Sequence, residues 1–197
     1  MDNMKSIVQL IEPFIDLVKT GQIDIYNEFS LQHEIGIFLR SSLPNAKIQF
    51  ERNVGNLFGS KTGFGKREID IVVYEPKLQN PSYAIELKYP RNGQYPEQMY
   101  SFCKDIAFAE QLHAAGCAQA ALVIFADDAL FYRGNCDGIY GYFRGQRPLS
   151  GPVQKPTGAK DSNVVLRGKY VVSWIPIIGD LACTVVEVGG DGGDMDF

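Results

Sequence analysis

The sequence lacks the features that direct a chain to a membrane or to an oxidising compartment. No uninterrupted apolar run approaches the roughly 18 residues that a membrane-spanning helix needs. Its first residues contain no basic stretch followed by an apolar core, so no secretory signal and no membrane partner are expected. Four widely scattered cysteines form no C-x-x-C pair: Cys103, Cys117, Cys136 and Cys183. This usage favours reduced thiols and a cytoplasmic location over a disulfide framework.

Positive charge is also scarce, because the formal net charge is -4. Basic residues outnumber acidic ones in residues 129–170, which hold seven basic and two acidic side chains. Arg133, Arg144 and Arg147 alternate there with aromatic residues and glycines, a composition that suits phosphate binding and base stacking. The same residues would equally suit a two-stranded extension whose aromatics pack on the core while its arginines are solvated. Both interpretations stay open from the sequence.

Two short alternating runs, residues 68–74 and 82–88, carry the most informative pattern in the chain. Each is rich in β-formers, and the seven residues between them are turn-forming, so together they predict an antiparallel hairpin. A hairpin centred on the turn places Asp70 opposite Glu86, with Lys88 on the same face. We expect the other face to be wholly apolar, formed by Ile69, Ile71, Val73, Tyr83, Ile85 and Leu87.

Two carboxylates side by side repel each other, and one should take up a proton unless a cation lies between them. A hard divalent ion such as Mg²⁺ or Mn²⁺ prefers oxygen ligands and keeps several waters. A water acidified by such an ion is a nucleophile, and Lys88 could orient it or stabilise charge on an attacked phosphate. The alternative is a plain cross-strand salt bridge between Lys88 and either Glu86 or Asp70.

Asp70, followed after fifteen residues by Glu86-x-Lys88, resembles the PD-(D/E)xK, or restriction-endonuclease-like, nuclease superfamily. Ile69 stands where the family motif has its proline. The resemblance implies an α/β core made of a helix, a three-stranded meander, a second helix and a fourth strand. The sequence supplies these elements in that order. Residues 27–42 have helical spacing, and residues 47–53 alternate as a first strand. The hairpin follows, then a helix from residue 95 to Gly116 and an apolar strand over 120–125.

The resemblance also implies roles for particular residues. Asp70, Glu86 and the Leu87 carbonyl would be metal ligands, and Lys88 would position the nucleophile or stabilise the transition state. Glu34 borders the apolar stripe of the first helix and would complete the catalytic site as an outer or additional ligand. On the second helix Gln98 is expected beside the site, and Asp105 shares its flank.

The sequence thus predicts a single domain over residues 1–188, with a core at about 26–126, an extra N-terminal helix and a basic β appendage at about 129–170. Residues 189–197 are expected to be a flexible acidic tail. The expected function is Mg²⁺- or Mn²⁺-dependent hydrolysis of phosphodiester bonds, with DNA as the partner. The alternatives are a catalytically silent or partner-dependent nucleic-acid-binding module on the same fold, or RNA as substrate. Monomer and homodimer are both left open.

Overall fold

The computed structural model describes residues 4–59, 63–76, 78–91, 93–145, 147–158 and 162–189. The helices within these ranges are α1 (Ile7–Lys19), α2 (Glu28–Ser42), α3 (Val54–Phe58), α4 (Tyr95–Ala114) and α5 (Tyr140–Phe143), with a short 3-10 turn, η1 (Ala129–Phe131). The strands are β1 (Lys47–Asn53), β2 (Glu68–Tyr74), β3 (Tyr83–Lys88), β4 (Gln119–Ala126), β5 (Leu149–Gln154), β6 (Asn163–Tyr170), β7 (Ile175–Ile178) and β8 (Leu181–Val188). The fold is therefore mixed α/β, as expected, while residues 190–197 of the predicted tail at 189–197 lie outside the described residues.

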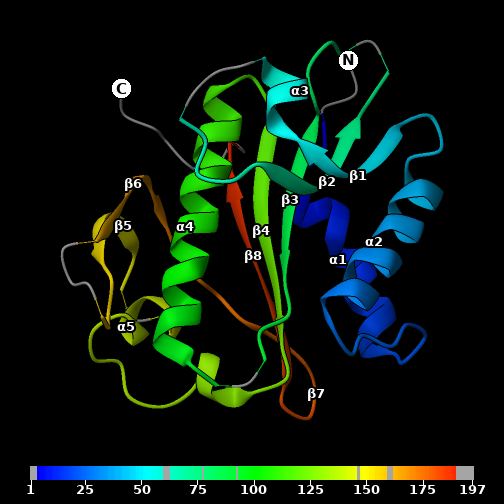
Figure 1. The fold of residues 1–197 in the computed structure, drawn as a ribbon. Helices are drawn as coiled ribbons and strands as arrows, with labels where there is room; N and C mark the ends of the chain where they lie inside the picture. Colours follow the sequence, from blue (N-terminus) through cyan, green and yellow to red (C-terminus); the bar gives the residue numbers. More distant parts are fainter. Residues whose placement is uncertain are drawn as a thin grey trace.

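Most strands belong to one six-stranded sheet with the order β1-β2-β3-β4-β8-β7 (Figure 1). Its neighbours are antiparallel except β3 and β4, which run parallel because α4 carries the chain from the end of one back to the start of the other. The separate pair β5 and β6 is antiparallel. The predicted order of helix, meander, helix and fourth strand is present as α2, β1 to β3, α4 and β4.

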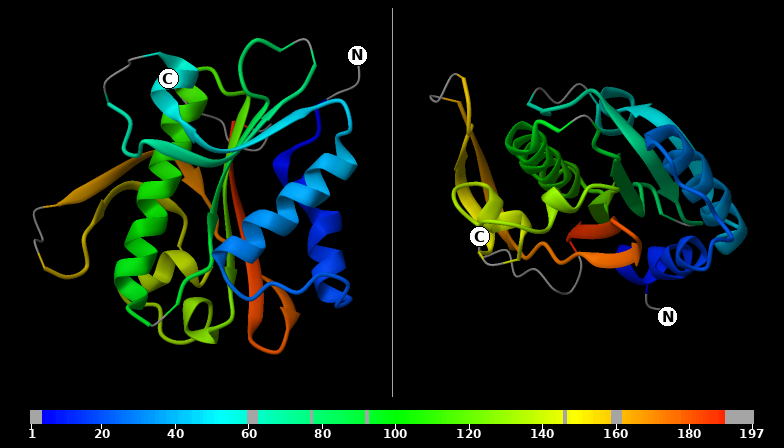
Figure 2. Two further views of the ribbon diagram at one scale, coloured as in Figure 1. Left: turned by 45° about the vertical axis from the view of Figure 1, so that its right-hand side comes forward. Right: turned by 90° about the horizontal axis from the view of Figure 1, so that it is seen from below.

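Helices cover both faces of the sheet, so the molecule has two cores. Figure 2 shows α1 and α2 on one face, α4 on the other, and the β5–β6 hairpin beyond α4. Strand β4 is buried along its whole length and alternates between the two cores. Ala120, Leu122 and Ile124 pack on the α4 side, and Ala121, Val123 and Phe125 pack on the side of α1 and α2.

Local sequence signals mark the start of α2 and both ends of α4. The Asn27 side chain accepts a hydrogen bond from the Ser30 backbone N–H at 2.7 Å, and Ser30 Oγ accepts one from Asn27 N at 3.1 Å. This reciprocal cap starts α2. A proline in the first turn suits the beginning of α4. Gly116, with φ of +112°, follows the last turn of α4 and allows the chain to reverse into β4.

One predicted face of the hairpin differs from the structure. Ile69 is buried in the core on the α4 side, whereas Ile71 packs on the side of α1 and α2. The cause lies in β1, where the ladder pairs Phe50 with Ile71 and Arg52 with Ile69, while Glu51 between them has φ of 48°. This left-handed residue interrupts the regular alternation of the ladder opposite Asp70.

The segment after β4 packs outside α4. Phe131 and Phe143 are buried against Phe102 of that helix, with ring centroids 6.0 and 5.7 Å away. The single tryptophan, Trp174, donates a hydrogen bond from Nε1 to the Phe143 carbonyl at 2.7 Å, and its ring lies 5.5 Å from that of Tyr132. Among the described helices none combines the length and the apolar character that crossing a bilayer requires.

Candidate functional site

The strands β2 and β3 separate where the predicted carboxylates lie. They pair as far as Ile71 opposite Ile85, which is the register expected from the turn, and the ladder ends before Asp70 and Glu86, which are close enough for their charges to interact. Asp70 Oδ2 accepts a hydrogen bond from the Leu87 backbone N–H at 2.7 Å. A carboxylate thus fills a place in the ladder that a backbone carbonyl would normally take, and this fixes the Asp70 side chain at the fork between the strands.

Glu86 is buried and forms an ion pair with a lysine from the segment before β2. Its side chain is 1% exposed, and its Oε2 accepts a hydrogen bond from Lys66 Nζ. The same ammonium lies 3.1 Å from Oδ1 of Asp105 on α4. Glu86 Oε1 and Asp105 Oδ2 are buried with no hydrogen-bond partner among the described residues. One ammonium therefore serves two buried carboxylates, and the excess negative charge favours a further cation or a proton.

The pKa values follow from this crowding. Burial raises the pKa of Glu86 to about 8; the charge of Asp70 adds to the rise and the charge of Lys66 opposes it. Burial alone would lower the pKa of Lys66, but the charges of Glu86 and Asp105, together with their hydrogen bonds, outweigh it and raise that pKa. The lysine therefore stays charged, whereas the protonation of Glu86 changes near neutral pH.

Lys88 lies at the exposed end of the same strand. Its Nζ donates a hydrogen bond to the Leu87 carbonyl at 2.7 Å and lies 4.0 Å from Oε1 of Glu28, the first residue of α2. The other oxygen of that glutamate accepts a hydrogen bond from the Tyr89 backbone N–H at 3.2 Å. The Lys88 side chain is 20% exposed. The ammonium is thus anchored at the carbonyl predicted as a ligand, with one side open to solvent.

Helix α2 presents a different flank to the fork from the one predicted. Gln32 Nε2 donates a hydrogen bond to the Asp70 carbonyl at 3.2 Å, and Glu28, one turn earlier, contacts the end of β3. Glu34 is half-buried, and its carboxylate lies 3.9 Å from Nδ1 of His33. The structure therefore brings Glu28 and Gln32 to the site, two residues that the sequence analysis did not select.

Of the two residues expected from the second helix, one lies in the site and the other does not. Asp105 contacts Lys66 inside the site. Gln98 donates from Nε2 to the carbonyls of Arg91 at 2.7 Å and Gly93 at 3.3 Å, so it fixes the turn that precedes α4. Lys66 itself was missed. It lies before β2 and outside any helix or strand, so no periodic pattern in the sequence assigned its side chain to the site.

Two of the three predicted nucleic-acid-binding arginines are engaged within their own segment. Arg144 donates to the Leu130 carbonyl at 2.9 Å and to Asn135 Oδ1 at 3.1 Å, and it lies 4.3 Å from the Tyr140 ring centroid. Such contacts favour the structural interpretation of this arginine that the sequence left open.

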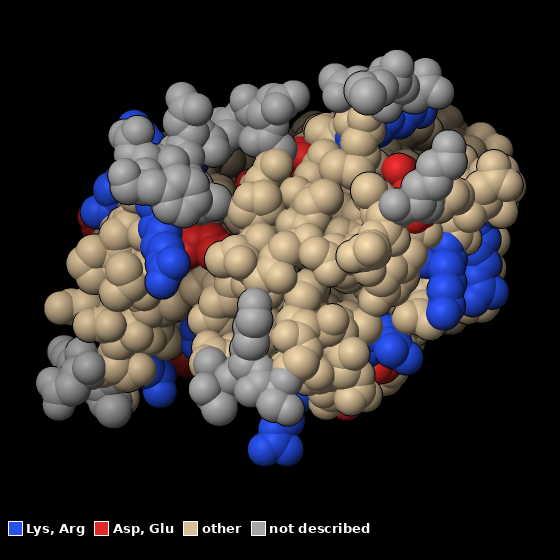
Figure 3. Space-filling model, turned by 90° about the horizontal axis from the view of Figure 1, so that it is seen from above, with Lys and Arg blue, Asp and Glu red and all other residues tan. Residues whose placement is uncertain are grey.

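Arg147 is held in the same way, since it donates to the Gly138 carbonyl and lies 3.9 Å from the Tyr142 ring centroid. Arg133 is exposed beside Tyr132 and remains a candidate for nucleic-acid binding. On the face drawn in Figure 3, the coloured lysine and arginine side chains lie in separate groups with uncharged surface between them. The described residues of that face therefore form no continuous basic track.

The donor set at the fork has the chemistry of a hard-cation site. Asp70, Glu86 and Asp105 supply carboxylate oxygens, of which Glu86 Oε1 and Asp105 Oδ2 lack hydrogen-bond partners among the described residues. In the described parts of the chain, however, no three His, Cys, Asp or Glu side chains are gathered closely enough to hold a metal ion. In this arrangement the ammonium of Lys66 offsets only part of the charge of the buried carboxylates.

Comparisons of the chain with protein-family models, with curated proteins and with solved structures found no match. What the site does is therefore inferred from its geometry and chemistry.

Proposed function

We propose that this protein is a metal-dependent nuclease of the PD-(D/E)xK type, with DNA as substrate. The observation that carries the proposal is the acidic pair Asp70 and Glu86 where the β2–β3 ladder ends, with interacting charges and with Lys88 two residues further along β3. Support also comes from the order of α2, β1 to β3, α4 and β4, which is the order that the restriction-endonuclease-like core requires.

Each residue at the fork has a function in this proposal. Asp70, Glu86 and the Leu87 carbonyl would hold Mg²⁺ or Mn²⁺, and the chemistry that the bound ion supplies is activation of water and neutralisation of phosphate charge. Hydrogen bonds donated by the Leu87 backbone N–H and by Gln32 Nε2 keep Asp70 in place on its strand. The partly exposed ammonium of Lys88 can reach a phosphate oxygen and stabilise the charge that develops during hydrolysis.

The direct test is cleavage of single-stranded, duplex and branched DNA, and of RNA, with and without Mg²⁺ or Mn²⁺. We expect Lys88→Ala to lower the single-turnover rate by roughly 100-fold or more while the affinity for DNA stays close to that of the parent, because the lysine acts on the transition state. Lys19→Ala on α1 is the matched control and should cleave normally. A Lys88→Ala variant that cleaves as fast as the parent would reduce this lysine to a strand-end contact.

A second candidate function is nucleic-acid binding without cleavage. One observation favours it: two of the predicted metal ligands are already occupied by lysines. Lys66 contacts Glu86, and Lys88 contacts the Leu87 carbonyl. The two candidates differ in their response to metal. A nuclease should gain thermal stability from Mn²⁺ by mass action, and a silent module should not.

A further inference from the structure

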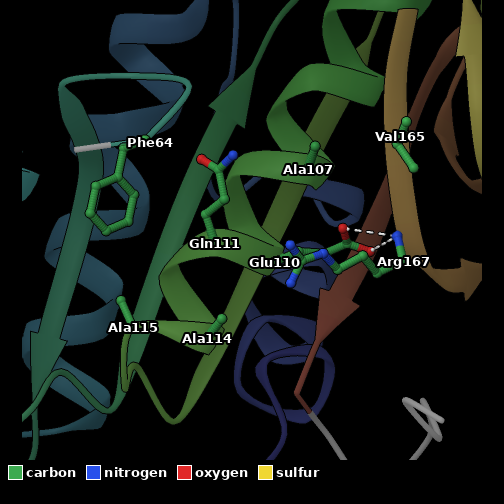
Figure 4. Close-up of a pocket in the computed structure, with 9 residues that line it drawn as sticks. Phe64, Ala107, Glu110, Gln111, Ala114, Ala115, Val165 and Arg167 are labelled. Carbon is green, nitrogen blue, oxygen red and sulfur yellow. Dashed lines mark hydrogen bonds between the residues drawn. The ribbon is translucent and has the colours of Figure 1, made fainter. Parts of the chain in front are cut away.

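A pocket of about 450 Å³ lies on the outer side of α4, away from the fork. Its floor is α4 at Ala107, Gln111 and Ala114; Phe64 forms one wall, and Val165 and Arg167 of β6 form the other (Figure 4). The volume is within the range of small-molecule sites. The pocket therefore combines an aromatic ring, an amide and a guanidinium around an apolar floor.

The wall formed by β6 is held in place by a buried carboxylate. Glu110 is 5% exposed and accepts hydrogen bonds from the backbone N–H groups of Arg167 at 2.9 Å and Gly168 at 2.7 Å, and from the Tyr170 hydroxyl at 2.7 Å. These bonds satisfy the carboxylate without the guanidinium of Arg167. Among the described residues, no carboxylate lies within ion-pair distance of that guanidinium, which extends from β6 across α4 in Figure 4.

The opposite wall is fixed as well. The Gly65 backbone N–H donates to Gln111 Oε1 at 2.8 Å, and this orients the amide so that its NH₂ group is left as a donor. The Phe64 ring packs edge-on against Phe108, with centroids 6.3 Å apart. One short segment connects the pocket with the candidate site, because Lys66, the next residue after Gly65, pairs with Glu86.

We propose that this pocket binds a nucleotide, with the base against Phe64 and the phosphate on Arg167. An aromatic face accepts any base by stacking, and a guanidinium without a protein carboxylate suits a phosphate. The Gln111 NH₂ group can donate to an acceptor on the base. Binding here goes beyond the proposed function, since it needs neither a metal ion nor cleavage. The nucleotide is either free or part of a nucleic-acid strand, because both present the same chemistry.

The test is equilibrium binding in the presence of EDTA, with AMP, dAMP, inorganic phosphate and a short labelled single-stranded DNA as probes. We expect Phe64→Leu to weaken nucleotide or oligonucleotide binding roughly ten-fold without affecting phosphate, because it removes stacking and keeps apolar bulk. Arg167→Ala should weaken every phosphate-bearing probe. Lys169→Ala is the matched control, since it removes an exposed cation from the same strand outside the pocket and should bind as the parent does.

The outcomes separate this proposal from the proposed nuclease. Loss of mononucleotide binding in both pocket variants supports a free nucleotide, and loss of oligonucleotide binding alone supports a unit of a strand. Parent-like affinity of Phe64→Leu and Arg167→Ala, or no binding by the parent, would overturn the pocket proposal even if Mg²⁺-dependent cleavage is observed. Because Arg167 is exposed, its variant should fold, and it remains informative if Phe64→Leu does not. Pocket-dependent binding without cleavage would instead count against the nuclease alone.

Discussion

The buried Glu86 should make the protein less stable as the pH rises through neutrality. Its pKa is about 8 in the folded protein against an ordinary value of 4.5, because of burial and the neighbouring charge of Asp70. The folded protein therefore keeps this proton over a pH range in which the unfolded chain has released it. The contribution of this proton to the free energy of unfolding is fully present below about pH 4.5. It decreases as the pH rises and is lost above about pH 8.

A pKa displaced this far corresponds to on the order of 5 kcal/mol as an upper limit. Relaxation and water penetration reduce such penalties, so we expect Glu86 to cost about 2 kcal/mol between pH 5 and pH 8.5. Glu86→Gln removes this titration and should have the higher free energy of unfolding at pH 8.5, with a gain in Tm of roughly 4–8 °C.

Denaturant unfolding of the parent and Glu86→Gln, followed by far-UV circular dichroism at several pH values, measures the effect. The difference between the two curves isolates Glu86 from the other carboxyl groups, which titrate alike in both proteins. Parallel curves between pH 5 and pH 8.5 would refute the reasoning, because they would mean that Lys66 keeps Glu86 ionised at no net cost.

Three further predictions follow from contacts in the structure. Asp70→Asn keeps an oxygen for the Leu87 N–H but removes the charge beside Glu86, so it should raise Tm by roughly 2–4 °C without metal. In thermal melts it should also abolish the Mn²⁺ stabilisation that the proposed function predicts, and an unchanged Mn²⁺ response would place the ion elsewhere. Arg147→Ala should lower the free energy of unfolding by about 1–2 kcal/mol and leave the salt dependence of any DNA binding unchanged. A flatter salt dependence at parent-like stability would instead assign this arginine to a nucleic-acid interface. Tyr170→Phe removes a donor from the buried carboxylate on α4 and should cost about 1–3 kcal/mol in denaturant unfolding; a parent-like value would show that the two backbone donors suffice.

The hairpin could be predicted from the sequence because two independent constraints agree there. Strand alternation fixes which residues share a face, and the short turn between the strands fixes the register, so the pairing of Ile71 with Ile85 was confirmed. The start of α4 and its end before Gly116 were likewise marked by residues with strong local preferences. The face of Ile69 was wrong because the interruption at Glu51 arises from pairing with another strand.

The residues that α2 brings to the site could not be fixed in the same way. Gln32 and Glu34 lie about 160° apart around the helix and border opposite edges of its apolar stripe. The stripe shows which side of the helix is buried, but the rotation that decides between its two edges depends on packing against β1 and β3. Lys66 lies outside any periodic segment, and its contacts with Glu86 and Asp105 depend on tertiary structure alone.

Trp174, the single tryptophan, is an intrinsic fluorescent probe at one position in the fold. Its indole contacts Phe143 and Tyr132 in the segment outside α4, so its fluorescence reports on the docking of that segment. Far-UV circular dichroism, in contrast, is dominated by the main sheet and the longer helices. Comparing the two signals during unfolding therefore separates detachment of the outer layer from loss of the central sheet. Coincident transitions would mean that both layers unfold as one cooperative unit.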